Sequence, residues 1–482
     1  MKQFLKLVLG LFAAGVLVCP AALAQRKPAP AGVSISGKIN LDDNYVALIS
    51  DLRGQNKQTI EVPIGKAGTF SWKSNVKSTG FIRVSFIPKS RKRQLAAIFP
   101  LYVQSGSKVQ LNLSYSDSTY LTLLSGKLDG NNKALIEYSN FSFLKMRDLF
   151  NNRPASVDKI KGSITPYLDQ ADSFMAKFGV KNETVKQYMD VWAMNNYLNG
   201  LFSLPGEVGG RSREVVLPAD YYVFPKSPAV VYNHDVAVLF NETNRNVNQY
   251  INMVDKDAAN SKDAFEQLKL KFKTLTRFFT SKALITAIVT SSLDEFTRKY
   301  NFKPNSNFED ELTKFKTLAA YVKDEKSRTE LNNSFSNLKY TFRGANLPDV
   351  AFKDAAGNDV KLKSLAAGKY IYIDLWASWC KPCIAEIPNL QKLENEYKDK
   401  NIVFVSISLD ADKNDWKNKM AELKSEGHQL ELGNSAYDKL MNVSGIPHFL
   451  LYDPAGKLIM YKAPRPGTQE IKAFFDQFLS SK

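Results

Sequence analysis

Two cysteines separated by two residues are the side chains of this sequence best suited to chemistry. Cys380 and Cys383 stand in the run 379–383, WCKPC. Such a pair can supply half of a zinc site, or it can form and open a disulfide. A structural zinc needs four ligands, and the two histidines of the same region, His428 and His448, lie 20 residues apart. We therefore interpret the pair as a redox-active dithiol and expect no metal.

The elements expected around the pair give the two cysteines different roles. Residues 369–376 form an apolar, β-branched run that predicts a buried strand, and a helix is expected from 382 to about 398. Cys380 then lies at the start of the helix, where free N–H groups and the positive end of the helix dipole favour the thiolate. We predict that Cys380 is the attacking nucleophile and that Cys383, one helical turn later, is the resolving thiol.

Four neighbouring side chains can support this chemistry. Lys381 adds a positive charge beside the nucleophile, and Pro382 is tolerated because the first helical turn has no donor to lose. Asp374 lies inside the apolar run, where burial would raise the pKa of its carboxyl toward the working range. The alternative for Asp374 is a strand-end aspartate bonded to backbone. Glu386 shares a helix face with Cys383, although a solvated helix glutamate fits the same pattern.

Residues 346–482 resemble the thioredoxin-fold domain of the TlpA/ResA-like extracytoplasmic thiol-disulfide oxidoreductases. Three stretches carry the resemblance: the opening segment 347–349, LPD; the strand and turn 372–380, YIDLWASWC; and the loop 445–447, GIP. The resemblance covers the whole C-terminal part of the chain and implies an α/β thioredoxin-like fold. The preceding residues are similar to N-terminal extensions of some family members.

The resemblance also assigns roles around the cysteines. It implies that a mixed disulfide forms through Cys380 and that Asp374 moves protons to and from Cys383. It further implies that Glu386 tunes the pKa values of the cysteines. Many family members have asparagine at the position of Asp374, so in this feature the chain is closer to thioredoxin.

The loop 445–447 is expected to form part of the substrate surface. Its Pro447 is expected to follow a cis peptide bond, and the loop offers backbone for β-type pairing with a substrate chain. Trp376 is assigned to the core, and His448 to the start of the next strand. The substrate is expected to contact Trp379, Lys381, Pro382, Ile446 and Pro447.

The first 24 residues have the features of a cleaved signal peptide. Lys2 and Lys6 form a positive region, an apolar stretch follows at 7–18, and small residues at 22–24 offer a cleavage site. The apolar stretch is shorter than the roughly 20 residues of a membrane-spanning helix. Cys19 follows a valine rather than a small residue, so a lipoprotein is not expected. We predict an exported protein of the periplasm or cell envelope, whose remaining thiols are the pair described above.

The rest of the chain divides into three regions by pattern. We predict a β-sandwich-like domain at 25–130, where short alternating strands are separated by turn signals. An α-helical region is expected at 131–342, where apolar residues recur at helical spacing. Residues 343–482 show the strand and helix pattern of an α/β thioredoxin-like domain. The predicted fold is therefore multidomain, and only its last region combines residue types that suggest catalysis.

The composition limits the partners. Lys and Arg number 65 against 48 Asp and Glu, a net charge of +17, and hydrophobic residues make up 44% of the chain, as in soluble globular proteins. No later stretch approaches 18 apolar residues, so we expect no membrane span after signal cleavage. We interpret the excess charge as solvated lysines and, because the chain is exported, expect no nucleic-acid partner.

The predicted function is the reduction of disulfides in envelope proteins, with no cofactor beyond the Cys380–Cys383 disulfide itself. A dithiol in an oxidising compartment needs electrons, which implies a membrane thiol electron donor. Some family members act in cytochrome c maturation, but nothing in this sequence selects that substrate or an oligomeric state. Two alternatives remain open: a net disulfide oxidase or isomerase, and an envelope binding or assembly protein with an accessory thioredoxin domain. A peroxidase is disfavoured because Ile373 and Ala377 replace the Pro and Thr of the peroxiredoxin pattern.

Overall fold

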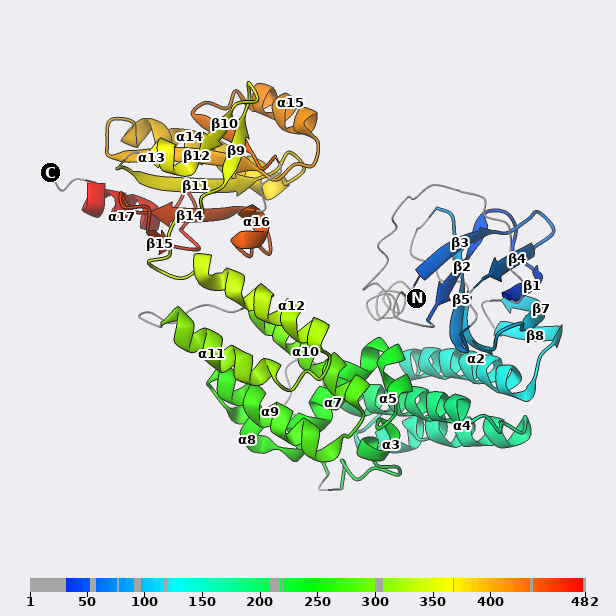
Figure 1. The fold of residues 1–482 in the computed structure, drawn as a ribbon. Helices are drawn as coiled ribbons and strands as arrows, with labels where there is room; N and C mark the ends of the chain where they lie inside the picture. The colour runs from blue at the N-terminus through cyan, green and yellow to red at the C-terminus, as the bar shows by residue number, and fades with distance from the viewer. Residues whose placement is uncertain are drawn as a thin grey trace. The chain divides into compact units, whose positions relative to one another are not determined.

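The computed structural model describes residues 32–52, 58–75, 78–90, 97–116, 119–208, 217–218, 220–299, 307–366, 368–433 and 437–479. The predicted signal peptide and Cys19 lie outside the described residues. The chain divides into two compact units, the first ending at Ala287 and the second beginning at Ile288 (Figure 1). In the described ranges, no helix combines the length and apolar character that crossing a bilayer requires.

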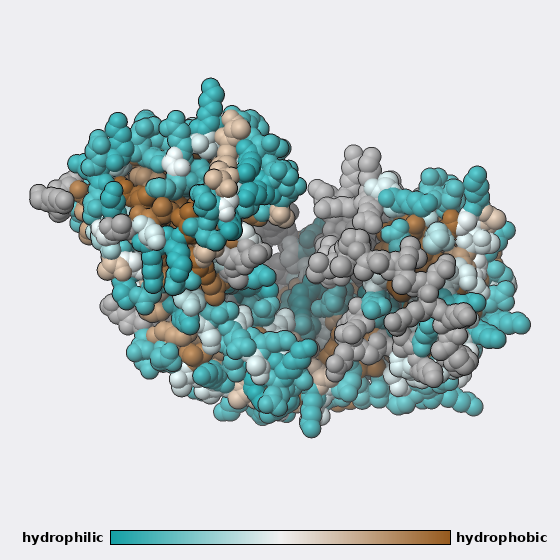
Figure 2. Space-filling model, turned by 45° about the horizontal axis from the view of Figure 1, so that its top comes forward, coloured by the Kyte–Doolittle hydropathy of each residue, from teal (hydrophilic) through white to brown (hydrophobic). Residues whose placement is uncertain are grey.

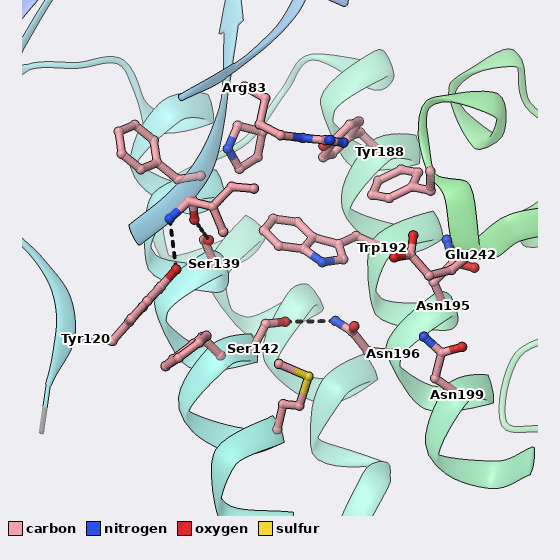
Figure 3. A pocket seen from close by; sticks show the side chains of 16 residues that line it. Arg83, Tyr120, Ser139, Ser142, Tyr188, Trp192, Asn195, Asn196, Asn199 and Glu242 are labelled. Atoms are coloured by element: carbon pink, nitrogen blue, oxygen red, sulfur yellow. Dashed lines mark hydrogen bonds between the residues drawn. The ribbon is translucent and has the colours of Figure 1, made fainter. Parts of the chain in front are cut away.

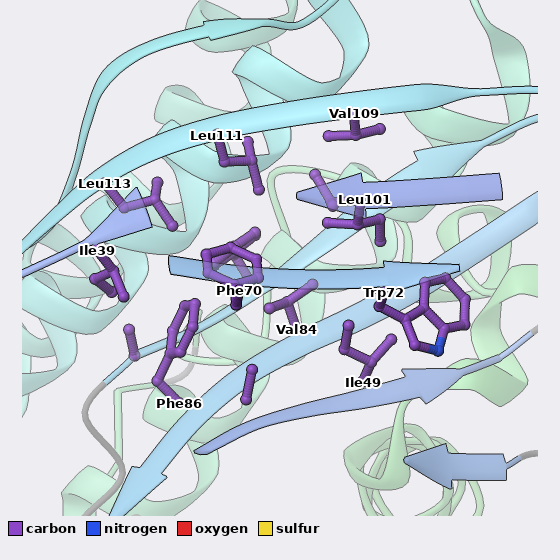
Figure 4. Packing of buried hydrophobic residues seen from close by; sticks show 14 of the residues in the cluster. Ile39, Ile49, Phe70, Trp72, Val84, Phe86, Leu101, Val109, Leu111 and Leu113 are labelled. Atoms are coloured by element: carbon purple, nitrogen blue, oxygen red, sulfur yellow. The ribbon is translucent and has the colours of Figure 1, made fainter. Parts of the chain in front are cut away.

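The first unit begins with eight strands in two four-stranded sheets, ordered β4-β1-β7-β8 and β3-β2-β5-β6. Apolar residues alternate with exposed ones along the strands, as in a sheet with one buried face. Side chains from both sheets form one core, which includes Phe70 and Leu111 from one sheet and Val84 and Phe86 from the other (Figure 4). The strands are β1 (Val33–Ile39), β2 (Tyr45–Asp51), β3 (Gln58–Pro63), β4 (Thr69–Ser74), β5 (Gly80–Pro88), β6 (Ala97–Val103), β7 (Lys108–Ser116) and β8 (Tyr120–Lys127).

The helical region starts directly after β8. Asp129 caps the first helix by accepting a hydrogen bond from the Asn132 backbone N–H. The Asn132 side chain then pairs with the backbone of Tyr102 in the edge strand β6, donating to its C=O and accepting from its N–H. This pairing covers an otherwise open sheet edge and docks the helix on the sheet.

The helices confirm a helical middle region. The compact-unit boundary falls inside α10, so the helical region contributes to both units, and the domain boundaries predicted at 130/131 and 342/343 stay predictions. The elements are α2 (Gly130–Asn151), α3 (Asp158–Ile164), α4 (Pro166–Lys177), α5 (Glu183–Val208), α6 (Pro228–Val231), η1 (Asp235–Leu239), α7 (Asn241–Val254), α8 (Lys256–Asn260), α9 (Ala264–Phe278), α10 (Lys282–Lys299), α11 (Phe308–Ala319), α12 (Glu325–Ser336) and η2 (Asn337–Tyr340).

The C-terminal part of the second unit is built on a seven-stranded mixed sheet, ordered β10-β9-β13-β12-β11-β14-β15. The central strand β11 runs parallel to β12 and antiparallel to β14. The elements are β9 (Ala351–Asp354), β10 (Asp359–Lys361), α13 (Leu362–Ala366), β11 (Tyr370–Trp376), α14 (Lys381–Tyr397), β12 (Ile402–Ser408), α15 (Lys413–Leu423), β13 (His428–Glu431), α16 (Tyr437–Leu440), β14 (His448–Tyr452), β15 (Leu458–Met460) and α17 (Gln469–Leu479).

Helices cover both faces of this sheet, and the alternation along β11 decides which residue faces which helix. Ile371, Ile373 and Leu375 share a core with α13 and α16. Tyr372 points to the opposite face, into a core with α14 and α17. Because successive side chains of a strand alternate, Asp374 lies on the same face as Tyr372, toward α14.

Candidate active site around Cys380 and Cys383

The cysteine pair lies where β11 leads into α14. Cys380 is the N-cap residue of α14, and its Sγ accepts a hydrogen bond from the Cys383 backbone N–H at 3.2 Å. The two sulfurs form a disulfide, with the Cα atoms 5.2 Å apart. Both cysteines are largely buried, at 5% and 2% exposure. Cys380 therefore lies at the positive end of the helix, in the position that the sequence predicts.

A carboxylate from the neighbouring strand fixes the turn before Cys380. Asp410, just after β12, accepts hydrogen bonds from the backbone N–H and the hydroxyl of Ser378, and from the hydroxyl of Ser408. The Cys380 N–H donates to the Ala377 carbonyl at 3.0 Å, which closes the turn. Asp410 is not among the site residues predicted from the sequence. Its position directly after a strand parallel to β11 is the signal that could have identified it, because such strands end at the same edge of the sheet.

Trp379 is the exposed apolar side chain at this site. Its exposure is 68%, whereas Trp376 is 1% exposed and packs with both cysteines in one cluster. The other large exposed hydrophobic residues are scattered along the chain, and the face in Figure 2 is mainly hydrophilic with apolar residues in small groups. An exposed tryptophan beside a disulfide is therefore a local feature of this site.

The other residues predicted to contact the substrate either follow Cys380 in the chain or belong to the loop that packs on the cysteine cluster. Lys381 and Pro382 are exposed in the first turn of α14. Ile446 packs against the cluster that contains both cysteines. The peptide bond between Ile446 and Pro447 is cis, which confirms that prediction. The structure thus brings the loop 445–447, which is distant in sequence, to the cysteines.

Asp374 is a buried carboxylic acid beneath the site. Its exposure is 4%, and no other described residue hydrogen-bonds to its carboxyl group in this structure. Burial, and then the negative charge of Glu386, raise the pKa of Asp374 to about 8. The prediction that the strand buries this group and raises its pKa is confirmed. The alternative, a strand-end aspartate bonded to backbone, does not fit this environment.

Glu386 is held by a residue from a distant part of the chain. Its Oε1 accepts a hydrogen bond from Arg465 Nη1 at 3.1 Å, and its Oε2 accepts one from Asn389 Nδ2 at 3.3 Å. The Glu386 side chain is 16% exposed, so it is not a fully solvated helix glutamate. The pairing with Arg465, which no local pattern indicates, ties the cysteine-bearing helix to the segment before α17.

His448 is the first residue of β14, as predicted. It is 8% exposed, and its ring packs edge-on against the ring of Tyr461, with 4.8 Å between the two ring centroids. Burial lowers the pKa of His448 to about 4, so the ring is neutral at physiological pH. Among the described residues, no group of three or more His, Cys, Asp and Glu side chains is arranged to hold a metal ion.

The first unit contains a separate pocket, away from the cysteines in sequence. It has a cavity of about 120 Å³ between the strands β5 and β6 and the helices α2, α5 and α7 (Figure 3). Trp192, Tyr188 and Phe240 give it an aromatic wall, and Arg83 and Glu242 add charges of opposite sign. This combination of aromatic and polar side chains is typical of a small-molecule or side-chain binding site.

Residues 342–460 match the family model described as Redoxin. The thiol-disulfide oxidoreductase ResA of Bacillus thuringiensis is 30% identical over 119 residues, which cover 24% of this chain and 66% of that protein. The thioredoxin-like protein YneN of Bacillus subtilis is 38% identical over 72 residues, 15% of this chain and 42% of that protein. The chain therefore covers less than two thirds of each of these relatives.

Solved structures of similar sequence carry related names. The thioredoxin domain of a thiol-disulfide oxidoreductase from Bacteroides vulgatus is 32% identical in sequence. The matched region covers 28% of the present chain and 97% of the Bacteroides vulgatus chain, with a TM-score of 0.26. A thiol:disulfide interchange protein from Bacteroides sp. is 31% identical, covers 29% of this chain and 91% of that chain, and gives a TM-score of 0.27.

Proposed function

We propose that this protein, whose C-terminal region is a redoxin domain related to the ResA-like thiol-disulfide oxidoreductases, exchanges disulfides with other proteins through Cys380 and Cys383. The observation that carries the proposal is the placement of the pair. One cysteine caps a helix N-terminus and the other is bonded to it, above a buried carboxylic acid. In this proposal the cysteine pair is the redox group, and no further cofactor is required.

The proposed reaction runs in two exchange steps. The Cys380 thiolate attacks a substrate disulfide, so that the substrate S–S bond breaks, a Cys380–substrate disulfide forms and one substrate sulfur leaves as thiolate. Cys383 then gives its proton to Asp374 and attacks the Cys380 sulfur. The Cys380–Cys383 bond forms, and the second substrate sulfur leaves. The protein loses two electrons, and the substrate gains two electrons and takes up protons from water.

The roles of the surrounding residues follow from their positions. Trp379, Lys381, Pro382, Ile446 and Pro447 form the proposed substrate surface. Glu386 adds negative charge beside Asp374 and favours its neutral form. An acid with a pKa of about 8 can both accept and return a proton near neutral pH, which suits a group that serves Cys383 in either direction of exchange.

The direction of electron flow and the location are also part of the proposal. We assign net reduction of envelope protein disulfides, because the dipeptide Lys-Pro between the cysteines is close to that of thioredoxin. We assign export because residues 1–24 have the pattern of a signal peptide. A measured reduction potential well above roughly −200 mV would instead indicate a net oxidase or isomerase. N-terminal sequencing of the protein purified from its envelope fraction checks the cleavage after Ala24.

The decisive experiment is trapping of the mixed disulfide. Cys383→Ser should accumulate protein partners bound through Cys380, and mass spectrometry identifies them. The matched control is Cys380→Ser, which removes the nucleophile and should trap none of the same partners. If Cys383→Ser traps no partner and the wild type does not reduce insulin, the proposed activity is wrong.

The pocket of the first unit favours a second candidate function. In this alternative, residues 25–342 bind a partner through a β-sandwich-like domain and the helices, and the redox domain is accessory. The supporting observation is the aromatic cavity at Trp192 with Arg83 and Glu242 in its wall. Trp192→Ala should then weaken partner capture by the Cys383→Ser protein while exchange with insulin is unchanged. Unchanged capture would remove the support for this candidate.

A further inference from the structure

A small pocket lies beside the carboxyl group of Asp374. Its internal volume is about 20 Å³, which is enough for one water molecule. Asp374 and Trp376 from β11 line it together with Glu394, Glu426 and Gln429, and the remaining lining residues are Ile387, Leu390, Gln391, Ser406 and Ser425. A buried carboxyl group without a hydrogen-bond partner among the described residues thus faces a space that fits water.

Two further buried groups at this pocket lack partners. The Trp376 indole N–H and the Gln429 side-chain carbonyl are both buried, and neither makes a hydrogen bond within the described part of the chain. Buried polar groups are almost always paired, either with protein or with ordered water. A water in the pocket could accept from the Trp376 N–H and donate to the Gln429 oxygen, which makes the pocket polar enough to be wet.

The acids of the pocket are ordered from buried to exposed. Asp374 is buried, Glu394 on α14 is half-buried, and Glu426 in the segment before β13 is exposed. The backbone of Gly427, at φ +71°, lies so close to Glu394 that an added Cβ would overlap Glu394 Oε1. The Glu394 carboxyl group therefore lies against this segment.

The electrostatics of the pocket favour proton binding. Burial, and then the charge of Glu426, raise the pKa of Glu394. The charge that acts on Asp374 is that of Glu386 on α14. Glu394 and Glu426 line the same pocket, and no Lys, Arg or His lines it among the described residues. Raised pKa values mean that both acids bind a proton more readily than exposed carboxylates do, and water in the pocket would offer a path for the proton between them.

We propose that this pocket holds ordered water that carries the proton of Asp374 to and from solvent, and that Glu394 is the outer relay. The inference rests on the proposed function and deepens it. When Cys383 gives its proton to Asp374 and attacks Cys380, the proton then passes through the pocket water to Glu394 and to bulk water. Asp374 is thereby returned to its carboxylate for the next cycle. In the reverse direction the proton enters by the same route.

The test compares Glu394→Gln with Glu396→Gln in the full chain. Glu396 lies on the same helix, pairs with Lys472 and does not line the pocket. The measured quantity is the rate at which Cys383 releases a model disulfide peptide from Cys380, across pH and at low and high imidazole concentration. Glu394→Gln should slow this step roughly five- to tenfold at low buffer, and imidazole should restore it by supplying a diffusible proton carrier. Glu396→Gln should match the wild type.

The possible outcomes separate this inference from the proposed function. A wild type that exchanges disulfides while Glu394→Gln keeps the same rate, or a slow rate that imidazole does not restore, overturns the relay and leaves the function in place. A wild type without exchange overturns both. A crystal structure at high resolution gives an independent check, since water between Trp376 Nε1 and Gln429 Oε1 is expected and a dry pocket contradicts the proposal.

Discussion

The carboxyl group of Asp374 is removed from bulk water without gaining a hydrogen bond from another described residue, and this has a free-energy cost that depends on pH. Its pKa rises from 3.8 to about 8 on folding. Between about pH 4 and pH 8 the unfolded chain therefore releases a proton that the folded chain retains, so folding stability falls as pH rises through this range. Below about pH 4 the group is neutral in both states and has no such effect.

Replacing this group with a neutral amide should stabilise the protein at neutral pH. Asp374→Asn is expected to raise the free energy of unfolding of the oxidised protein by about 2 to 4 kcal/mol at pH 7 and by little near pH 4. Urea denaturation at both pH values measures this. The matched control is Asp399→Asn at an exposed position, for which we expect changes within about 0.5 kcal/mol. An equal gain for Asp374→Asn at both pH values would contradict the assigned pKa.

The two tryptophans near the cysteines should respond oppositely to substitution. Trp379→Ala removes an exposed ring and should change the free energy of unfolding by less than about 0.5 kcal/mol. It should slow exchange with protein disulfides, which use the surface, and leave exchange with a small disulfide such as oxidised dithiothreitol unchanged. Trp376→Ala removes a buried ring and should lower the free energy of unfolding by about 3 to 5 kcal/mol. Thermal denaturation and exchange rates separate the two effects. A large loss of stability for Trp379→Ala would be inconsistent with its exposure.

At the scale of elements, the position of the cysteines depends on the edge of the sheet where β11 and β12 end. The Asp410 carboxylate, directly after β12, holds the Ser378 backbone and hydroxyl and so fixes the turn that leads from β11 into α14. The nearby Asp412 has a different task, because it caps α15 by accepting from the Asn414 N–H. The two carboxylates are therefore a matched pair for separating stability from site geometry.

Loss of the Asp410 carboxylate, which fixes the turn, should affect the reactivity of Cys380, whereas loss of the Asp412 helix cap should not. Asp410→Ala is expected to lower the free energy of unfolding by about 1 to 3 kcal/mol, because the Ser378 donors lose their acceptor, and to raise the pKa of the Cys380 thiol as the turn loosens. Asp412→Ala should lower the free energy of unfolding by about 1 kcal/mol and leave the pKa of the Cys380 thiol unchanged. Alkylation of the reduced protein by iodoacetamide across pH reports the thiol pKa. If both variants alkylate like the wild type, Asp410 has no role in positioning Cys380.

Elements with a strong local pattern were predictable from the sequence. The strand predicted at 369–376 corresponds to β11, and the helix predicted from 382 to about 398 corresponds to α14, each with ends within one residue of the prediction. The strand β13 was missed because it has four residues and Leu430 is the one apolar residue among them, which is too little to show an alternation. The strand forms because it pairs with β12 and β9, and this pairing depends on the arrangement of the whole sheet.

The same distinction applies to the site. Cys380 and Cys383 were identifiable from their spacing, and Asp374 from a charge within an apolar run. Arg465 and Glu394 were not, because they reach the site through the order of the strands and the docking of helices on the sheet. Side chains joined by tertiary contacts leave no local pattern in a single sequence.

At the scale of the whole molecule, the second compact unit begins well before the redoxin match. The unit starts at Ile288 and the match at residue 342. Residues at and before the start of the match contact the α/β domain. The Asn442 side-chain amide donates to the Thr297 carbonyl in α10, and Tyr340 in η2 and Phe342 pack against the core of the sheet. The segment 288–342 is thus part of the structural support of the redox domain.

A fragment that keeps this segment should be more stable than one that lacks it. Residues 288–482 are expected to exceed residues 346–482 in free energy of unfolding by about 1 to 3 kcal/mol, since the shorter fragment loses the burial contributed by Tyr340 and Phe342. Urea denaturation of both fragments measures the difference. Both should keep the disulfide exchange of Cys380, because the site residues all follow residue 346. Equal stabilities would show that the preceding helices add nothing to the domain.

The indole ring of Trp379 is exposed and adjoins Cys380 in the chain. Disulfides quench the emission of nearby indoles more strongly than thiols do. Opening the Cys380–Cys383 bond should therefore brighten the emission of Trp379 and of Trp376, which packs with both cysteines. The protein thus contains its own optical readout of redox state, and equilibrium titration against a glutathione couple can be followed without an added label.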